Sequence, residues 1–271
     1  MALSKLNNFE ERPLVCLEVN PPRGTDASSI FKRLDGKTDG IDFFNVTDSA
    51  LAKMRCGALP FASILKNRYG IEPMVNVSCR DRNTIALQSD LISASMLGIK
   101  SVVALTGDAM SVGDNKEAKA VFEVNSIGLL NLVNNLNSGF DSVGNNLHGN
   151  TSYVPGVVFN PNAKNPDAEL RRLTKKKDAG ARYALSQPVF DEDLAENFFK
   201  EAQKIEIPLF LGLLPFKTLS AARGFSSIPG IKFPEKLIQK LETEKEEDLS
   251  DFSINCCLGI ARKCKRFIRG Y

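Results

Sequence analysis

Short apolar runs alternate along the chain with longer segments in which apolar residues recur at helical spacing. Continuous apolar runs bounded by turn residues are typical of strands that are covered on both faces of a parallel sheet. Strands and helices that alternate at intervals of about 30 residues predict βαβ units. The strand candidates are Leu14–Val19, Asp42–Thr47, Glu72–Ser78, Ser101–Leu105, Val154–Phe159, Tyr183–Ser186 and Pro208–Leu214.

Helical patterns fill most of the connections between these runs. The candidate Asp167–Ala179 starts after Asn165 and Pro166 and ends before Gly180, which are good start and stop signals. The charged run Lys240–Asp248 is interpreted as a solvated helix face or a mobile connection. The other helix candidates are Ala58–Arg68, Thr84–Leu97, a stretch near Val124–Leu136, Asp191–Lys204 and Phe252–Phe267.

The 271 residues suit one (β/α)8 TIM-type barrel, a fold of about 250 residues. We expect residues 1–271 to form a single domain, with an insertion at about 109–152 after the fourth strand. Only seven strands are visible before Tyr271, so the eighth strand and helix are expected to be missing. The chain is then a fragment, an open barrel or a barrel completed by another chain, and we expect the gene to continue past Tyr271.

Composition excludes several classes of function. A net charge of +3, with acidic residues interspersed among the basic ones, predicts no nucleic-acid partner. Six cysteines without a CxxC pair, and a single histidine at 148, predict no metal site. No apolar stretch approaches the roughly 18 residues of a membrane span, and the N-terminus has no apolar signal region, so we expect a cytoplasmic protein without a membrane partner.

Polar residues follow almost every strand candidate. In a parallel barrel the active site lies at the carboxyl ends of the strands, where such residues converge. A lone Asp or Asn in this place more often caps a loop or helix, and that alternative stays open for each. The residues are Glu18, Thr47 with Asp48, Ser78 with Arg80 and Asp81, Thr106 with Gly107 and Asp108, Asn160, and Gln187.

Glu18 is the most informative of these residues because it lies inside an apolar run, LVCLEV. Burying a carboxylate without a partner costs several kcal/mol. One interpretation is that Arg23 or Arg80 pairs with it. The other is that apolar surroundings raise its pKa, as a general acid at neutral pH requires.

Three further features are compatible with a ligand site. Asp108 follows Gly107, which would let the backbone approach a ligand, although helix capping would also explain the aspartate. Gln187 offers a donor and an acceptor, which suits a heterocycle. The helix candidate with Arg171, Arg172, Lys175, Lys176 and Lys177 is a solvent face or a phosphate-binding cluster. The sequence contains neither a GxGxxG nor a P-loop motif, so we expect that a nucleotide would not be held by either of these loops.

Seven segments occur along the chain in this order: LEVNPPRG (17–24), NVTDSA (45–50), SCRDRN (78–83), ALTGD (104–108), NPNAKNPDAELRRL (160–173), SQPVFD (186–191) and GLLPFKTLSAA (212–222). Together they resemble the methylenetetrahydrofolate reductase family over nearly the whole chain. A further segment, VFEVNSIGLLNLVNNLNSG at 121–139, resembles the reductase half of bifunctional homocysteine methyltransferase proteins.

The resemblance implies an FAD-containing barrel that takes a hydride from NADH or NADPH and reduces 5,10-methylenetetrahydrofolate to 5-methyltetrahydrofolate. It implies that Glu18 is the general acid, that Asp108 lies beside flavin and folate and stabilises an iminium intermediate, and that Gln187 binds the pterin. It also implies a homo-oligomer or a subunit of a larger complex. The implied flavin contacts are Thr47, Ser49, Ala50, Asn76, Thr106, Gly107, Asp108, Asn160, Ala163, Glu169, Arg172, Lys175 and Lys176.

The chain departs from the family pattern in three places. Asn76 stands where many members have histidine, and Thr106 where some have arginine, which bears on flavin affinity. The family's last strand, with a substrate-binding arginine, lies beyond this sequence. Two alternatives follow: a flavin-free or differently coupled reductase of the same fold, and a non-catalytic subunit that binds folate or a partner.

Overall fold

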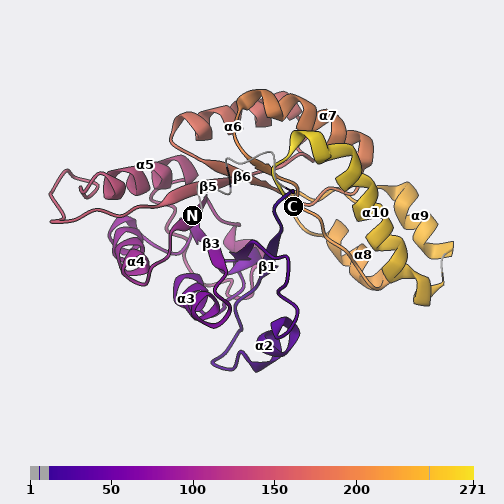
Figure 1. Cartoon of the computed structure of the whole chain (residues 1–271), viewed down its shortest axis with the longest axis horizontal. Helices are drawn as coiled ribbons and strands as arrows, with labels where there is room; N and C mark the ends of the chain where they lie inside the picture. The colour runs from indigo at the N-terminus through magenta and orange to yellow at the C-terminus, as the bar shows by residue number, and fades with distance from the viewer. Residues whose placement is uncertain (1–5, 7–11, 244) are drawn as a thin grey trace. The chain divides into compact units, whose positions relative to one another are not determined.

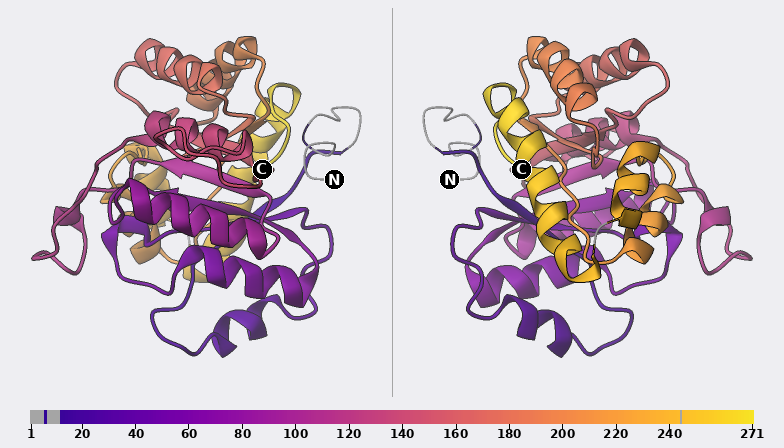
Figure 2. Two further views of the ribbon diagram at one scale, coloured as in Figure 1. Left: turned by 90° about the vertical axis from the view of Figure 1, so that its left-hand side faces the viewer. Right: turned by 90° about the vertical axis from the view of Figure 1, so that its right-hand side faces the viewer.

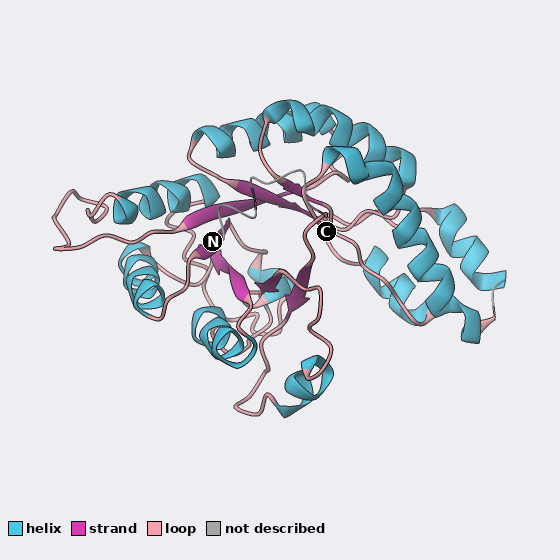
Figure 3. Ribbon diagram, in the orientation of Figure 1, coloured by secondary structure: helices cyan, strands magenta, loops and turns pink. Residues whose placement is uncertain are grey.

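The computed structural model describes residues 6, 12–243 and 245–271 and is an alternation of strands and helices (Figure 1; Figure 3). The strands are β1 (Cys16–Val19), β2 (Phe43–Val46), β3 (Glu72–Ser78), β4 (Ser101–Leu105), β5 (Val154–Phe159), β6 (Tyr183–Ser186) and β7 (Leu209–Phe210). The α-helices are α2 (Ser28–Leu34), α3 (Ala58–Tyr69), α4 (Thr84–Met96), α5 (Ser126–Asn137), α6 (Pro166–Asp178), α7 (Glu192–Ala202), α8 (Leu219–Ser226), α9 (Glu235–Thr243) and α10 (Leu249–Cys264).

The seven strands form one sheet in the order β1-β2-β3-β4-β5-β6-β7. The recorded strand pairs are parallel, with Glu18 opposite Asn45 and Asn45 opposite Met74. Sequential parallel strands joined by helices are the repeating pattern of a TIM-type barrel, so the predicted fold class is confirmed. The predicted bounds of β3, β4, β5 and β6 are confirmed to the residue.

The strand β7 is shorter than the predicted Pro208–Leu214 because its ladder ends early. The backbone N–H of Gly212 donates to the Ser186 hydroxyl at 2.8 Å instead of continuing a ladder of backbone hydrogen bonds. A single parallel bridge joins Phe210 to Gly270, and the Arg269 N–H donates to the Leu209 carbonyl at 2.7 Å. Among the described residues the eighth strand therefore amounts to one bridge, as expected for a barrel without its last strand.

The chain divides into two compact units. The first contains Leu14–Val157 and Asp178–Arg182, and the second contains Val158–Lys177 and Tyr183–Tyr271. The single-domain organisation stays a prediction. The predicted insertion lies in the first unit and comprises the 3-10 turn Met110–Val112, the helix α5 and a turn in which Asp141 accepts hydrogen bonds from Val143 and Asn145.

In the first unit the helices α3, α4 and α5 lie along one side of the strands (Figure 1; Figure 2). The core between them contains Phe43, Phe44, Val75, Leu87 and Leu130, none of which is more than 1% exposed. Burial of such side chains contributes roughly 1.5–3 kcal/mol each. This packing fixes the strand ends that carry the candidate site.

In the second unit α7 packs against α10, and α8 packs against α9. An aromatic cluster forms around Phe190, whose ring centroid lies 4.5 Å from that of Phe233 and 6.1 Å from that of Phe225. Leu241, only 1% exposed, belongs to this cluster. The interpretation of Lys240–Asp248 as a solvated face or mobile connection is therefore wrong at Leu241, where the end of α9 contributes to the core.

Candidate functional site

The predicted site residues fall in both units, and each unit is described by itself. The first unit holds Glu18, Thr47, Ser49, Ala50, Asn76, Thr106, Gly107 and Asp108. The second holds Asn160, Ala163, Glu169, Arg172, Lys175, Lys176 and Gln187.

Glu18 lies near the end of β1, and its carboxylate has no ion-pair partner among the described residues. Two amides face it: Asn20 Nδ2 donates to Oε1 at 3.5 Å, and Asn45 Nδ2 donates to Oε2 at 3.4 Å. Neither arginine of the ion-pair interpretation reaches it, because Arg23 binds Asp114 and Arg80 binds Asp81. Burial raises the pKa of Glu18, and the two amide hydrogen bonds oppose this effect only in part.

Glu18 lines a groove of about 690 Å³ in the first unit. The apolar residues of its lining include Leu17, Ile30 and Leu34. The lining also carries three guanidinium groups and one further carboxylate. These groups belong to Arg23, Arg33, Arg55 and Asp26. A ligand in this groove would meet a protonatable carboxyl group, apolar surface and positive charge.

The backbone after β2 is strained at three residues. Ser49, Leu51 and Ala52 all have positive φ, at 46°, 56° and 52°. Such conformations cost a non-glycine residue about 1–3 kcal/mol and persist where surrounding contacts hold them. Here Arg80 Nη2 donates to the Ser49 carbonyl at 3.2 Å.

Asp108 supplies a second contact to this strained turn. Its Oδ2 accepts a hydrogen bond from the backbone N–H of Leu51 at 2.8 Å. The next α-helix, α5, is capped by another residue, Asn125. In this structure Asp108 therefore holds the backbone after β2 and does not cap α5.

Gly107 is required by packing within the first unit. It has a φ of +101°, and a Cβ at this position would lie 2.3 Å from Ser78 Oγ and 2.9 Å from Arg80 Cβ. Glycine tolerates both the dihedral angle and the approach. The sequence interpretation, close approach to a ligand, stays a prediction beside this structural role.

A buried ion pair links the ends of β2 and β3. Asp48 Oδ2 accepts from the Ser78 N–H at 2.8 Å and also contacts Arg82 Nη2. Burial raises the pKa of Asp48, although Arg82 acts in the opposite direction. Arg82 additionally binds Asp90 at 3.2 Å. Sequence reasoning named Asp48 but missed Arg82, whose role depends on a residue 34 positions earlier in the chain.

Two asparagine oxygens lie buried without a hydrogen-bond partner among the described atoms: Asn45 Oδ1 and Asn76 Oδ1. The Asn76 residue is only 8% exposed. Buried acceptors of this kind are uncommon, because most are satisfied by protein, water or a bound molecule. Thr47, by contrast, is satisfied, because its hydroxyl donates to Asn20 Oδ1 at 2.8 Å.

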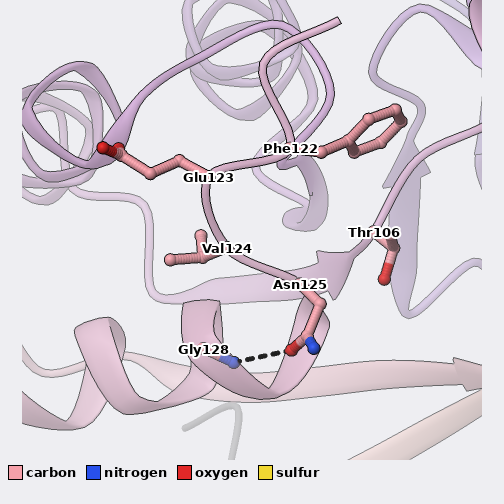
Figure 4. A pocket seen from close by; sticks show the side chains of 6 residues that line it. All are labelled: Thr106, Phe122, Glu123, Val124, Asn125 and Gly128. Atoms are coloured by element: carbon pink, nitrogen blue, oxygen red, sulfur yellow. Dashed lines mark hydrogen bonds between the residues drawn. The ribbon is translucent and has the colours of Figure 1, made fainter.

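Thr106 lines a hollow of about 440 Å³ at the start of α5 (Figure 4). Its hydroxyl oxygen accepts from the Ser126 N–H at 3.2 Å. The cap of α5 is Asn125, whose Oδ1 accepts from the N–H groups of Ile127 and Gly128 at 3.0 Å each. The other lining residues are Phe122, Glu123 and Val124, which sequence reasoning did not single out.

The second unit holds a chain of contacts on α6. Glu169 Oε1 accepts from the Asn160 N–H at 3.0 Å, and Oε2 pairs with Arg172. Lys176 Nζ donates to the Val158 carbonyl at 2.7 Å. Burial lowers the pKa of Lys176, with Glu169 acting in the opposite direction. Lys176 is thus part of the packing of α6 onto β5.

The basic residues of α6 therefore do not form one solvent face. Lys177 Nζ donates to the Ile205 carbonyl at 2.5 Å and lies 3.9 Å from the Glu206 carboxylate. Arg171 and Lys175 are exposed, as is Arg172 beside Glu169. Only these three remain available to an anion.

Gln187 lies in a segment that is held from two sides. Asn162 Nδ2 donates to the Pro188 carbonyl at 2.8 Å, and the Gln187 N–H donates to the Phe159 carbonyl at 2.8 Å. A Cβ on Gly212 would lie 2.6 Å from the Ser186 carbonyl oxygen, so glycine permits this close packing. No hydrogen bond of the Gln187 side chain to a described residue is recorded, which leaves its amide available to a ligand.

Within the part of the chain that the structure describes, no group of three or more His, Cys, Asp or Glu residues could hold a metal ion. None of the described helices combines the length and the apolar character that a membrane span needs.

The matching family model and the similar curated proteins agree on one family. The family model "Methylenetetrahydrofolate reductase" matches residues 3–269. The chain is 28% identical over 242 residues to "Methylenetetrahydrofolate reductase (NADH) 1" of Arabidopsis thaliana, covering 85% of this chain and 40% of that protein. It is 25% identical over 224 residues to "5,10-methylenetetrahydrofolate reductase" of Salmonella typhimurium, covering 81% and 70%.

A probable NADPH-type reductase of Caenorhabditis elegans is 22% identical, and the chain spans 38% of its length. Among solved structures, a Clostridium thermocellum protein that binds two copies of 5-methyl-5,6,7,8-tetrahydrofolic acid has a TM-score of 0.69 at 15% identity. The match covers 98% of this chain and 87% of that one, and it supports the fold. With a family model matched from residue 3 to residue 269, the chain belongs to the methylenetetrahydrofolate reductase family.

Proposed function

We propose that this protein is an FAD-dependent oxidoreductase that reduces 5,10-methylenetetrahydrofolate to 5-methyltetrahydrofolate with NADH or NADPH. The observation that carries the proposal is Glu18, a carboxyl group with a raised pKa and no cation partner, at the side of a groove. A raised pKa favours retention of the proton that a general acid donates. We further propose a cytoplasmic protein that acts as a homo-oligomer or as a subunit of a larger complex.

The residues present fit a flavin. Asn76 Oδ1 is a buried acceptor that lacks a donor, as an N–H of the isoalloxazine ring could supply. The hollow beside Thr106 offers an aromatic side chain, Phe122, and the positive end of α5. On α6, Arg172 and Lys175 are exposed cations that could pair with phosphate.

FAD, when bound, supplies a carrier that accepts a hydride from a reduced nicotinamide and passes it to the folate. The other proposed cofactor contacts are Thr47, Ser49, Ala50, Gly107, Asp108, Asn160, Ala163, Glu169 and Lys176. Asn160, Glu169 and Lys176 would act indirectly, because the contacts described above hold α6 in place.

The protein's own part in the reaction is to bind, orient and donate one proton. Glu18 would donate a proton to the folate nitrogen released when the five-membered ring opens. Asp108, a carboxylate next to a strained turn, would stabilise positive charge that develops on the folate. Gln187 would hydrogen-bond the pterin through its amide.

The cap of α5 offers a test of the flavin hollow. Replacing Asn125 with alanine should reduce the free energy of unfolding by about 1 kcal/mol and weaken FAD binding, because the helix start lines the hollow. Asn83→Ala is the matched control: it removes the cap of α4, which accepts from Ala86, at a place that does not line the hollow. Urea unfolding and FAD titration measure both effects. Equal FAD affinities in the two variants would contradict the assignment of the hollow.

The test of the whole proposal is an absorbance spectrum. We expect the purified protein to be yellow with close to one flavin per chain, NADH or NADPH to bleach the flavin band, and methylenetetrahydrofolate to restore it. A colourless protein that takes up no added FAD would favour a flavin-free reductase. Flavin reduction without reoxidation by the folate would contradict the proposed substrate.

A further inference from the structure

Asn45 faces Glu18 across the neighbouring strands β1 and β2. The register places the two residues directly opposite each other. Asn45 Nδ2 donates to Glu18 Oε2 at 3.4 Å, while Asn20 Nδ2 donates to the other carboxylate oxygen at 3.5 Å. Each oxygen of the proposed proton donor therefore has one amide donor.

The two amides differ at their other end. Asn20 Oδ1 accepts the Thr47 hydroxyl at 2.8 Å, so both ends of this amide are occupied. Asn45 Oδ1 is buried and has no donor among the described residues. A buried acceptor without a donor marks a place where a bound molecule can supply one.

The same face of the sheet carries a second acceptor of this kind. Alternation along β1 puts Cys16 and Glu18 on one face, and Cys16 Sγ lies 3.8 Å from Met74 Sδ. Asn45 is opposite Met74 in the register, and Asn76 follows Met74 on the same face, with its own Oδ1 buried and unpartnered. The proposed flavin would supply the donor for Asn76, which leaves Asn45 Oδ1, beside a carboxyl group, for an N–H of a second heterocycle.

We propose that Asn45 positions the folate: its Oδ1 accepts a ring N–H of the reduced pterin while its Nδ2 holds the Glu18 carboxyl group. This inference rests on the proposed function. It makes one amide the link between the proton donor and the substrate. The link would fix the distance over which the proton moves.

Two substitutions separate the two ends of the Asn45 amide. Asn45→Leu keeps the shape and removes both hydrogen-bonding atoms. It should weaken binding of 5-methyltetrahydrofolate about tenfold or more, leave FAD affinity unchanged, and keep or raise the thermal midpoint of the unliganded protein, because an unsatisfied acceptor is gone. Asn45→Asp keeps an acceptor, so folate affinity should stay within about threefold of that of the parent protein.

The pH profile gives an independent readout. In Asn45→Asp a second carboxylate replaces the amide donor, which should raise the pKa of Glu18 and move the upper pH limit of folate turnover to higher pH. The other titratable or charged groups near Glu18 are Cys16 on β1 and, in the same groove, Arg23 and Asp26 in the loop that follows β1, Arg33 on α2 and Arg55 after β2. They are unchanged in the variant.

Asn20→Leu is the matched control. It should lower the thermal midpoint, because the Thr47 hydroxyl loses its acceptor, and it should weaken folate binding less than Asn45→Leu does, because both ends of the Asn20 amide are occupied within the protein. The probes are 5-methyltetrahydrofolate and FAD, each titrated directly against the whole chain.

Unchanged folate affinity in Asn45→Leu would overturn the inference and leave the proposed function standing. Loss of FAD affinity in place of folate affinity would overturn the assignment to the pterin. If Asn45→Leu does not fold, Asn45→Asp decides. A tenfold loss of folate affinity in Asn45→Asp, which keeps an acceptor, would overturn the inference. A parent protein that binds no 5-methyltetrahydrofolate would overturn both the inference and the proposed function.

Discussion

Replacing Glu18 with glutamine should slow folate reduction by a factor of about 10² to 10⁴, the usual contribution of a general acid. Flavin reduction by the nicotinamide needs no proton from this residue and should keep its rate. Glutamine preserves the shape of the side chain, and its carbonyl oxygen can still accept from Asn20 or Asn45. Rapid-mixing absorbance measurements of the two half-reactions provide the comparison.

The pH dependence follows from the direction of the pKa shift. Burial raises the pKa of Glu18, so the proton is retained above the ordinary range of a glutamate. Folate reduction should therefore be fastest below the raised pKa and be lost as the pH rises through it. Asp26→Asn, which removes another carboxylate of the same groove, serves as the control and should retain the half-reaction that Glu18→Gln loses.

A measurement of stability distinguishes a Glu18→Gln variant that has lost only its catalytic proton from one that has lost its folded structure. A carboxyl group whose pKa is raised in the folded protein lowers the stability at pH values above its unfolded pKa, because the ionised form is disfavoured in the fold. At pH 7 Glu18→Gln should thus be at least as stable as the parent protein. Normal folate turnover in a stable Glu18→Gln variant would remove Glu18 from the mechanism.

The bounds of helices and strands were most predictable where the apolar pattern of a segment agrees with its burial in the fold. The bounds of β3, β4, β5 and β6 were predictable because each is an apolar run with turn residues on both sides. The helices α2, α8 and α9 were missed because they span only seven to nine residues, too few for a clear helical period. The end of β7 depends on the Ser186 hydroxyl, a contact between distant positions.

The same holds for the candidate site: some of its features follow from neighbouring residues, and others depend on residues far away in the sequence. A raised pKa for Glu18 was inferred from its apolar run and stays a prediction, and burial of the carboxylate in the structure acts in the same direction. Its amide neighbour Asn45 could not be foreseen, because the pairing depends on the register of two strands 27 residues apart. The same holds for Asp108, whose partner is a backbone N–H 57 residues earlier. Residue types predict possible chemistry, and the register decides which groups meet.

Gly107→Ala should be strongly destabilising. The new Cβ would overlap with Ser78 Oγ at 2.3 Å, and alanine would have to adopt a φ of +101°. Strain of about 1–2 kcal/mol from the backbone and about 1–3 kcal/mol from overpacking predict a loss of about 2–5 kcal/mol in the free energy of unfolding. Because Asp108 is the next residue, displacement here should also disturb its contact with Leu51 and slow folate turnover.

Gly144→Ala provides the matched control in the same unit. Gly144 has a φ of +92°, but nothing lies within 4 Å of the position that a Cβ would take. This variant should lose only about 1–2 kcal/mol, the cost of the backbone conformation alone. Urea unfolding of both variants isolates the steric contribution at Gly107, because the dihedral cost is common to both. Equal losses in the free energy of unfolding would mean that Ser78 and Arg80 move aside without a free-energy cost. The packing role assigned to Gly107 would then have to be abandoned.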